Sequence, residues 1–354
     1  MGGGYMTDDA EDGFLEITLV SIDEVDDQPA SAAGAYAGQV LDSRYEIIER
    51  MGRGGAGEVY RAKVLAGGPD VAIKVMRPRV ARNPDNVRRF RREARAAAML
   101  DHPNVIRVVE LARDQNGTMF IVMERLLGES VATWLAGLGR LPTIDEVTSV
   151  FRPMLDAFEA AHGREIVHRD LKTENLFLAR GDDGQTTLKV LDFGLAHVAD
   201  PDDAGTLTKP DAIGGTIEYM SPEQCRSLRV GPSTDLYAMG CLLTELLQGR
   251  PPFDGGAAAE IMARQMFMKP PSLDRPEGAE PVPDALEALR LSLLEKEPDQ
   301  RPASVTEVKR RYVRAMAKAP PSIAPPPSTP TPASERPSHE TLSDRVKRLF
   351  GLAK

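Results

Sequence analysis

The chain has 354 residues, of which 42% are hydrophobic, and a formal net charge of −9. This length allows two or three domains, or one catalytic domain built from two lobes, and the apolar content suits a chain that buries a core. Residues 1–43 contain ten acidic side chains and no basic one, so the remainder is close to neutral. The charge therefore belongs to the N-terminal tail and gives no support for nucleic-acid binding.

No apolar run approaches the roughly 18 residues that a membrane-spanning helix needs, so no transmembrane segment is expected. The N-terminus is acidic, whereas a signal peptide begins with basic residues. The two cysteines, Cys225 and Cys241, are too few for a disulfide framework and fit a reducing compartment. The sequence therefore predicts a cytoplasmic protein.

Composition divides the chain into four parts. Residues 1–43 form an acidic tail that is expected to be disordered, and residues 44–318 have the periodicity of a folded domain. Residues 319–340 include eight prolines and cannot pack a core, which predicts an extended linker. Residues 341–354 have the spacing of a short, basic, amphipathic tail.

The first part of the folded region is expected to be rich in strands. Short β-branched runs bounded by glycine or proline are typical of strands, and they occur at Tyr45–Glu49, Glu58–Val64, Val71–Met76, Val105–Leu111 and Thr118–Met123. Asn116-Gly117 predicts a hairpin between the last two. A helix is expected from Asp85 to about Leu100, because Asn83-Pro84 has the pattern of an N-cap followed by proline.

After Gly128 the pattern becomes helical. Thr143 and Glu146 have the spacing of a capping box, apolar residues follow at helical intervals, and Gly163 ends the run. Pro153 inside this run is expected to kink the helix. Further helices are predicted at Thr234–Gln248, Pro283–Leu294 and Ala303–Ala317.

A glycine-rich turn between the first two predicted strands matches the pattern G-x-G-x-x-G-x-V. Its residues are Met51, Gly52, Arg53, Gly54, Gly55, Ala56, Gly57, Glu58 and Val59. Dinucleotide-binding folds share this spacing, but in them a helix follows the glycines and an acidic residue stands about 20 positions later. Here a strand follows, and Lys74 stands 17 positions past Gly57. The turn is therefore expected to cover phosphates with its backbone N–H groups.

Lys74 lies on a predicted strand with apolar neighbours, where a buried ammonium needs a partner. Glu93 is the candidate, because it lies between Phe90 and Ala97 at the border of the inward face of the predicted helix. Such a pair would direct the lysine toward the α- and β-phosphates of a nucleotide.

The most specific motif combines His168, Arg169, Asp170, Lys172 and Asn175 with Asp192 in Leu191-Asp-Phe-Gly194. Asp170 would accept or orient the proton of a substrate hydroxyl, and Lys172 would neutralise the transferring γ-phosphoryl group. Asn175 and Asp192 would hold Mg²⁺, which prefers oxygen ligands. His168 is expected to be structural, because the companions of a hydrolytic triad are absent.

These motifs stand in the order found in protein kinases, and residues 44 to about 315 resemble the catalytic domain of bacterial eukaryotic-like (Hanks-type) serine/threonine kinases. The resemblance implies an α+β, bilobal fold with a small antiparallel β-rich N-lobe (about 44–124) and a larger α-helical C-lobe (about 128–318). It also implies ATP and Mg²⁺ as cofactors and proteins as substrates.

By the same resemblance, adenine would lie between the lobes, with Val59 and Ala72 above it and Phe177 below. The backbone from Glu124 to Leu126 would supply the hinge hydrogen bonds, and Met123 would be the gatekeeper.

The stretch Gly215–Glu223 resembles the end of a kinase activation segment. Glu223 would form a long-range ion pair with Arg301, and Asp235 would hold the backbone of the catalytic loop by accepting its N–H groups.

By the same resemblance, two residues indicate serine or threonine rather than tyrosine as acceptor. Lys172 stands two residues after the base, and Thr216 is expected to touch Asp170 and Lys172. The resemblance also implies that Arg169 would bind a phosphate on the activation segment. Thr206 and Thr208 are the expected acceptors, which predicts autophosphorylation.

Three residues depart from the family pattern. Thr173 replaces a proline, with no expected effect, and Ser221 replaces a commoner alanine. Ala97 occupies a regulatory position that usually holds a larger side chain, which would leave the Glu93 helix loosely held.

Two other functions remain open, a pseudokinase scaffold and a small-molecule kinase of related fold. The complete set of catalytic residues disfavours the first, and the Gly215–Glu223 segment with Arg301 disfavours the second. Residues 14–25 would dock a partner or a sheet edge, or be disordered. Residues 341–354 would bind an acidic partner, an anionic membrane or the acidic N-terminal tail, or remain solvated.

Overall fold

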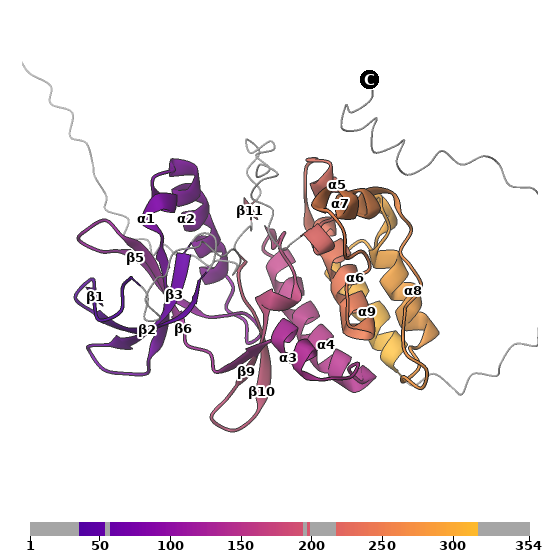
Figure 1. Cartoon of the computed structure of the whole chain (residues 1–354), viewed down its shortest axis with the longest axis horizontal. Coiled ribbons are helices and arrows are strands. Elements are labelled where there is room, and N and C mark those ends of the chain that lie inside the picture. Colours follow the sequence, from indigo (N-terminus) through magenta and orange to yellow (C-terminus); the bar gives the residue numbers. More distant parts are fainter. Residues whose placement is uncertain (1–34, 54–56, 194–196, 199–216, 318–354) are drawn as a thin grey trace, which may run out of the picture.

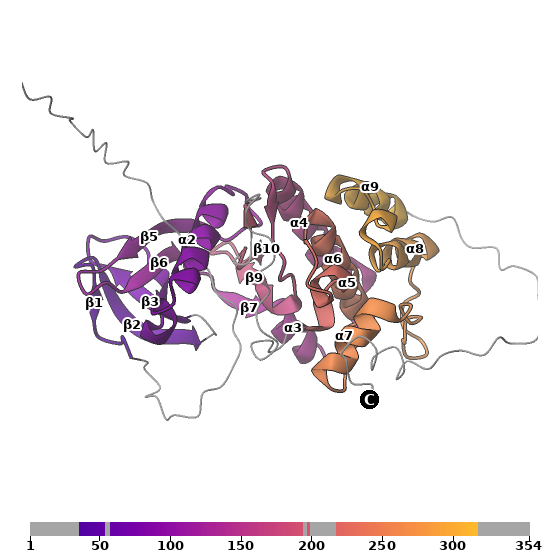
Figure 2. The same cartoon turned by 90° about the horizontal axis from the view of Figure 1, so that it is seen from above.

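The computed structural model describes residues 35–53, 57–193, 197–198 and 217–317. Within them the chain forms two lobes, a smaller one built mainly from strands and a larger one built mainly from helices (Figure 1). Figure 2 shows the same arrangement from above, with the strand-rich lobe at one end of the long axis. The predicted α+β, bilobal fold is confirmed.

The N-lobe contains a six-stranded antiparallel sheet. Its strands are β1 (Val40–Leu41), β2 (Tyr45–Arg53), β3 (Gly57–Val64), β4 (Val71–Met76), β5 (Val108–Arg113) and β6 (Met119–Glu124), in the order β1-β2-β3-β4-β6-β5. All six residues of β4 are buried, which explains why its sequence is apolar apart from Lys74. The hairpin predicted at Asn116-Gly117 joins β5 and β6, with Gly117 at a φ of 83°.

Two helices follow β4 and lie against the sheet, α1 (Pro78–Ala81) and α2 (Pro84–Ala98) (Figure 1). Phe90 and Ala94 of α2 pack in one buried cluster with Met76, Leu111 and Ile121 of the sheet. The predicted helix is therefore present, and its apolar stripe faces the sheet, as the spacing indicated.

The C-lobe is mainly helical. Its elements are β7 (Gly128–Ser130), α3 (Val131–Gly137), α4 (Ile144–His162), β8 (Ile166–Val167), β9 (Leu176–Arg180), β10 (Thr186–Val190), β11 (His197–Val198), α5 (Pro222–Cys225), α6 (Pro232–Gln248), α7 (Ala258–Phe267), α8 (Asp284–Leu293) and α9 (Val305–Met316). The strands pair in the orders β10-β9-β7 and β11-β8. In the described part of the chain, no helix combines the length and apolar character needed to cross a membrane.

The capping box predicted at the start of α4 is present. The Thr143 hydroxyl accepts the N–H of Glu146 at 3.2 Å, and the Glu146 carboxylate accepts the N–H of Thr143 at 2.8 Å. Gly163 follows the last helical residue, as predicted. Pro153 lies inside α4, which continues through it as one helix from Ile144 to His162.

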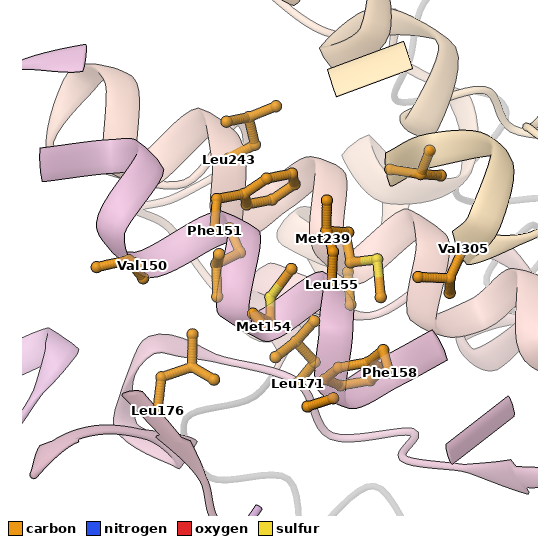
Figure 3. Packing of buried hydrophobic residues seen from close by; sticks show 14 of the residues in the cluster. Val150, Phe151, Met154, Leu155, Phe158, Leu171, Leu176, Met239, Leu243 and Val305 are labelled. Carbon is orange, nitrogen blue, oxygen red and sulfur yellow. The ribbon is translucent and has the colours of Figure 1, made fainter. Parts of the chain in front are cut away.

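The core of the C-lobe lies between α4 and α6. Phe151 and Leu155 of α4 lie beside Leu243 and Met239 of α6, and Val305 at the start of α9 closes the side of this cluster (Figure 3). Met239, Leu243, Phe151 and Leu155 are fully buried. This rigid packing supports the segments that carry the polar residues described below.

Residues before the domain boundary that composition placed at residue 43 take part in the described fold. Tyr36 packs edge-on against Tyr60, with ring centroids 5.9 Å apart. β1 pairs with β2, and Leu41 is buried in the sheet cluster. The tight turn between β1 and β2 uses positive φ angles of 49° at Asp42 and 55° at Ser43. Asp42, counted with the acidic tail, therefore belongs to the fold.

The substitution Leu155→Ala is expected to lower the free energy of unfolding by about 3 kcal/mol, because it deletes a fully buried side chain and leaves a cavity. Urea denaturation followed through the fluorescence of Trp134 measures this loss. Leu291→Ala on α8, where the side chain is 38% exposed, is the control and should cost about 1 kcal/mol or less. Equal losses would contradict the placement of Leu155.

Candidate active site

An apolar cluster lies between the sheet and the hinge that joins the lobes. It contains the buried residues Ala72, Ala97, Ile106 and Met123, with Val59, Val108, Leu126 and Leu191 partly buried against it. Four residues that the resemblance assigned to the adenine site, Val59, Ala72, Met123 and Leu126, are therefore brought together. Phe177 lies on β9 beside Gly128 and is outside this cluster.

The glycine-rich turn is described on both sides of its tip. Gly52 and Arg53 end β2, Gly57 begins β3, and residues 54–56 lie outside the described residues. A Cβ atom at Gly57 would stand 2.5 Å from the carbonyl oxygen of Val75, so only glycine fits against β4 here. Glu58 pairs with Arg53 at 3.5 Å and bonds the Tyr60 hydroxyl.

The hinge is fixed by the side chain of Glu124. Its carboxylate accepts the N–H of Arg107 at 2.7 Å and pairs with Lys189 of β10, also at 2.7 Å. The N–H of Glu124 donates to the carbonyl of Arg107 at 2.9 Å. Because Lys189 belongs to the C-lobe, Glu124 ties both lobes to the hinge segment. The sequence placed Glu124 in the hinge only through its backbone, so this side-chain role was missed.

The two lobes meet at Lys74 and Asp192. The Lys74 Nζ lies 3.3 Å from the Asp192 Oδ1, and the two residues are 1% and 6% exposed. Burial raises the pKa of Asp192 above its ordinary value, against the opposing charge of Lys74. Asp192 also has a φ of 48°, which is rare for a residue with a side chain and is typical of strained functional sites.

Glu93 lies on α2 between Phe90 and Ala97, the position that its spacing predicted. Ala97 of α2 is buried in the same apolar cluster as Ala72 of the strand that carries Lys74. The Glu93 side chain lies outside the described residues. The Lys74–Glu93 pair therefore stays a prediction.

Asp170, Lys172 and Asn175 converge in the catalytic loop. The Asn175 Nδ2 donates to the main-chain oxygen of Asp170 at 2.8 Å and to its Oδ2 at 3.2 Å. Since the amide nitrogen is used in this way, the amide oxygen of Asn175 is the atom left to bind a metal. The Lys172 Nζ lies 3.6 Å from the Asp170 Oδ2. A carboxylate, an ammonium and an amide oxygen are thus held together in a buried loop.

His168 has a structural role, because both nitrogens of its ring contact main-chain atoms. Its Nδ1 accepts the N–H of Asp170 at 3.2 Å, and its Nε2 lies 3.0 Å from the carbonyl of Leu191. A carbonyl only accepts, so Nε2 is the donor in the contact with Leu191. The ring also packs against Phe193, with centroids 4.9 Å apart. His168 therefore joins the catalytic loop to the segment that carries Asp192.

Asp235, in the first turn of α6, holds the backbone of the catalytic loop. Its carboxylate accepts the N–H of His168 at 2.9 Å and the N–H of Arg169 at 2.8 Å, as the resemblance implied. His162 at the end of α4 lies 2.8 Å from the same carboxylate, a partner that the sequence did not reveal. Burial favours a higher pKa for Asp235, but the hydrogen bond and charge of His162, among others, outweigh it and lower the pKa.

Glu223 and Arg301 form the predicted ion pair. The two guanidinium nitrogens lie 2.7 and 2.8 Å from the two carboxylate oxygens, a bidentate geometry. The guanidinium also donates to the carbonyls of Ser233, Glu295 and Lys296. The pair therefore fixes the start of α5 to the loop before α9, 78 residues later.

Two departures from the family pattern make hydrogen bonds that the sequence did not suggest. Thr173, where the family has proline, places its hydroxyl 3.2 Å from the Tyr219 hydroxyl and 3.4 Å from the Glu245 carboxylate. Tyr219 also bonds Glu245, and burial raises the pKa of Glu245 to about 7. Ser221 caps α5 by accepting the N–H of Gln224 at 3.3 Å.

Thr206, Thr208 and Thr216 lie outside the described residues, so their predicted roles stay predictions. Arg169 is described and has a φ of 67°, and Gln224 of α5 donates to its carbonyl at 2.9 Å. No group of three or more His, Cys, Asp or Glu side chains suited to a metal occurs among the described residues. The candidate metal ligands are therefore the amide of Asn175 and the carboxylate of Asp192.

A model of the protein kinase domain family matches residues 45–313. Serine/threonine-protein kinase pkn3 of Myxococcus xanthus is 35% identical over 280 residues, which cover 77% of this chain and 50% of that protein. PrkC of Bacillus subtilis is 34% identical over 264 residues, which cover 75% of this chain and 39% of that protein. The chain thus spans about half the length, or less, of these curated relatives.

The kinase domain of Mycobacterium tuberculosis PknI is similar in three dimensions, with a TM-score of 0.61. The alignment covers 79% of this chain and 100% of that domain, at 24% sequence identity. At this identity the likeness supports the fold alone. The fold is therefore shared with a solved kinase domain.

Glu223→Gln is expected to lower the free energy of unfolding by about 3 kcal/mol near neutral pH, because it leaves the Arg301 charge buried without its carboxylate. Burial works to raise the pKa of Glu223, but the hydrogen bonds and charge of Arg301 lower it overall. The stabilisation is therefore present above the unfolded-state pKa and is lost as the pH falls through the folded-state value.

Urea denaturation at a series of pH values measures the difference between wild type and Glu223→Gln, which should shrink as the pH falls below about 4. Glu297→Gln is the control, because the Glu297 side chain is 62% exposed and its ion pair with Arg226 has a longer separation of 3.5 Å. A stability difference between wild type and Glu223→Gln that stays constant with pH would contradict the buried Glu223–Arg301 pair.

Proposed function

This chain belongs to the protein kinase domain family, and on that premise we propose that it is a serine/threonine protein kinase. It transfers the γ-phosphoryl group of ATP to serine or threonine hydroxyls of proteins. The observation that carries this proposal is the buried group of Lys74, Asp192, Asp170, Lys172 and Asn175 at the junction of the lobes. Cations, a base and two oxygen donors for a metal are the components that phosphoryl transfer requires.

The donor set fits Mg²⁺ and nucleotide phosphates. Asn175 directs its amide nitrogen to Asp170, which leaves its oxygen as donor, and Asp192 supplies a carboxylate. The Asp192 carboxylate is buried and faces Lys74 at the junction of the lobes, where a metal bound to the nucleotide phosphates would lie within its reach. Asn175 and Asp192 would hold the metal, which when bound neutralises phosphate charge.

The protein groups have separable roles in the transfer. Asp170 receives or orients the proton of the acceptor hydroxyl, whose oxygen forms a bond to the γ-phosphorus. The bond from that phosphorus to the bridging oxygen breaks, and ADP leaves. Lys172 lies beside Asp170, where its charge stabilises the oxygens of the transferring group. Lys74 orients the other phosphates from the opposite lobe.

A protein acceptor is favoured by the Glu223–Arg301 pair. This pair, with the capped start of α5, gives the segment after residue 216 a fixed position next to the catalytic loop, where Gln224 contacts the carbonyl of Arg169. Such a surface suits an extended peptide better than a small molecule. We extend the proposal to autophosphorylation of Thr206 or Thr208 and to binding of that phosphate by Arg169.

Asp170→Asn is expected to reduce phosphate incorporation during incubation with Mg-ATP by about 10³-fold, because it removes the base while leaving the shape of the side chain. Mass spectrometry of the full chain detects the phosphate and its position. ATP affinity should stay within about threefold of wild type, since Asp170 contacts the acceptor rather than the nucleotide.

Asp156→Asn is the matched control, because Asp156 pairs with Lys309 on the surface of α4 at 2.7 Å, outside this group of residues. It should incorporate phosphate as wild type does. Equal incorporation by Asp170→Asn and wild type would contradict the assigned role. ATP binding without phosphate on any variant would favour a scaffold.

A further inference from the structure

A cleft lies in the C-lobe between α3, the start of α4 and the β9–β10 hairpin. Its volume is about 250 Å³, and its lining residues are Glu129, Trp134, Glu146, Ser149, Leu178, Arg180 and Thr186. None of these residues belongs to the candidate active site. Trp134 is the only tryptophan of the chain, and with Leu178 it packs partly buried against the main core. The cleft therefore has an apolar wall with carboxylates beside it.

The surroundings of the cleft are acidic. Residues 128–149 and 176–186, which provide the whole lining, contain five carboxylates and two arginines. Glu146 bonds Arg140 at 2.7 and 2.8 Å, and this bond, with the N–H of Thr143, lowers the pKa of Glu146 to about 2. Glu146 is therefore ionised at any physiological pH, and its charge is balanced by that of Arg140. The apolar wall lies beside the carboxylate of Glu129, and Asp145, Asp182 and Asp183 belong to the same segments. This arrangement fits a basic, amphipathic segment.

The last described helix, α9, packs against α4, whose first turns line this cleft. Near its start, α9 contacts the end of α4, where the Thr306 hydroxyl donates to Glu159 at 2.6 Å. Near its end, α9 contacts the start of α4, where the Tyr312 hydroxyl lies 2.9 Å from that of Thr148. The two helices are therefore antiparallel, and the end of α9 at Met316 lies beside the first turns of α4. Glu146 and Ser149 in those turns line the cleft.

The sequence beyond α9 provides a matching segment. Residues 341–354 contain four basic side chains and one acidic one, and Val346, Leu349 and Phe350 recur at helical spacing. The excess of positive charge in this segment is equal in size to the excess of negative charge in residues 128–149 and 176–186. The opposite charges and the shared apolar character favour this segment of the same chain as the occupant.

We propose that residues 341–354 dock in this cleft, with Leu349 and Phe350 against Trp134 and Leu178 and with the basic side chains among the surrounding carboxylates. The 24 residues 317–340 are long enough to connect the two. A chain of that length has ends about 27 Å apart when flexible and up to about 74 Å apart when it adopts polyproline II. The width of α4, about 10 Å with its side chains, is well within that reach.

Because residues 341–354 are tethered to the domain, a weak contact is sufficient to keep them in the cleft. A connecting chain of this kind gives the segment an effective concentration of about 1 mM at the cleft, so a contact with a dissociation constant of about 0.1 mM would be roughly 90% formed. The ionic part of the contact weakens with added salt. The proposal does not depend on the catalytic activity.

Acrylamide quenching of Trp134 fluorescence tests the docking directly, since no other tryptophan contributes. In the full chain, Leu349→Ala/Phe350→Ala should raise the quenching constant by about twofold, because it exposes the indole ring that the docked segment covers. Ile323→Ala, an apolar truncation in the proline-rich region, should leave the constant unchanged. Equal midpoints of urea unfolding show that the domain is intact in both variants.

Added synthetic peptide of residues 341–354 should restore protection of Trp134 in the double variant, and salt should reverse it. Equal quenching constants for wild type and the double variant would overturn the proposal. Protection in wild type that disappears on dilution would also overturn it, because the occupant would then be the tail of a second copy.

Discussion

The geometry of the candidate active site depends on one buried carboxylate. Asp235 lies in the first turn of α6, within the helical core, and accepts hydrogen bonds from two successive main-chain N–H groups, those of His168 and Arg169. His162 Nε2 lies 2.8 Å from the same carboxylate. Burying a charge without such partners would cost several kcal/mol, so these three groups around Asp235 are a condition of its burial. Their effect is to hold Arg169 at a φ of 67° and to set the direction in which Asp170 leaves the loop. The positions of the catalytic residues therefore depend on the packing of α4 against α6.

From that anchor, polar contacts extend to both sides of the site. His168 bonds the carbonyl of Leu191 and so positions Asp192, which meets Lys74 of the other lobe. On the opposite side, Gln224 bonds the carbonyl of Arg169 and joins the loop to α5, which the Glu223–Arg301 pair holds in place. The nucleotide side and the acceptor side therefore share one support. Because the groups are buried, each contact is worth more than an exposed one of the same length.

Motifs with fixed spacing could be predicted from the sequence, because each of them combines residue types that few other structures need. The strand of Lys74 and the capping box at Thr143 were expected from local patterns, and both are present. The Glu223–Arg301 pair, whose members are 78 residues apart, was expected from the family resemblance and is also present. His162 was missed because its partner lies 73 residues away and neither a local pattern nor the resemblance pointed to the pair. Thr173 was expected to have no effect, although it bonds Tyr219 across 46 residues. The β9–β10 hairpin carried a usable signal, since Gly181-Asp-Asp-Gly184 separates the apolar run Leu176–Ala179 from the β-branched run Thr186–Val190.

The most direct test of this account is the rate of phosphoryl transfer by the full chain carrying Asp235→Asn, measured together with its affinity for ATP. The substitution replaces one accepting oxygen of the side chain by an NH₂ donor, which faces the N–H groups of His168 and Arg169. The catalytic loop should therefore shift, while the contact between Lys74 and Asp192 is kept. We predict a transfer rate about 10²-fold lower, because a displacement of about 1 Å is enough for that loss, with an ATP affinity within about threefold of wild type. A transfer rate equal to that of wild type would contradict the claim that Asp235 positions the site.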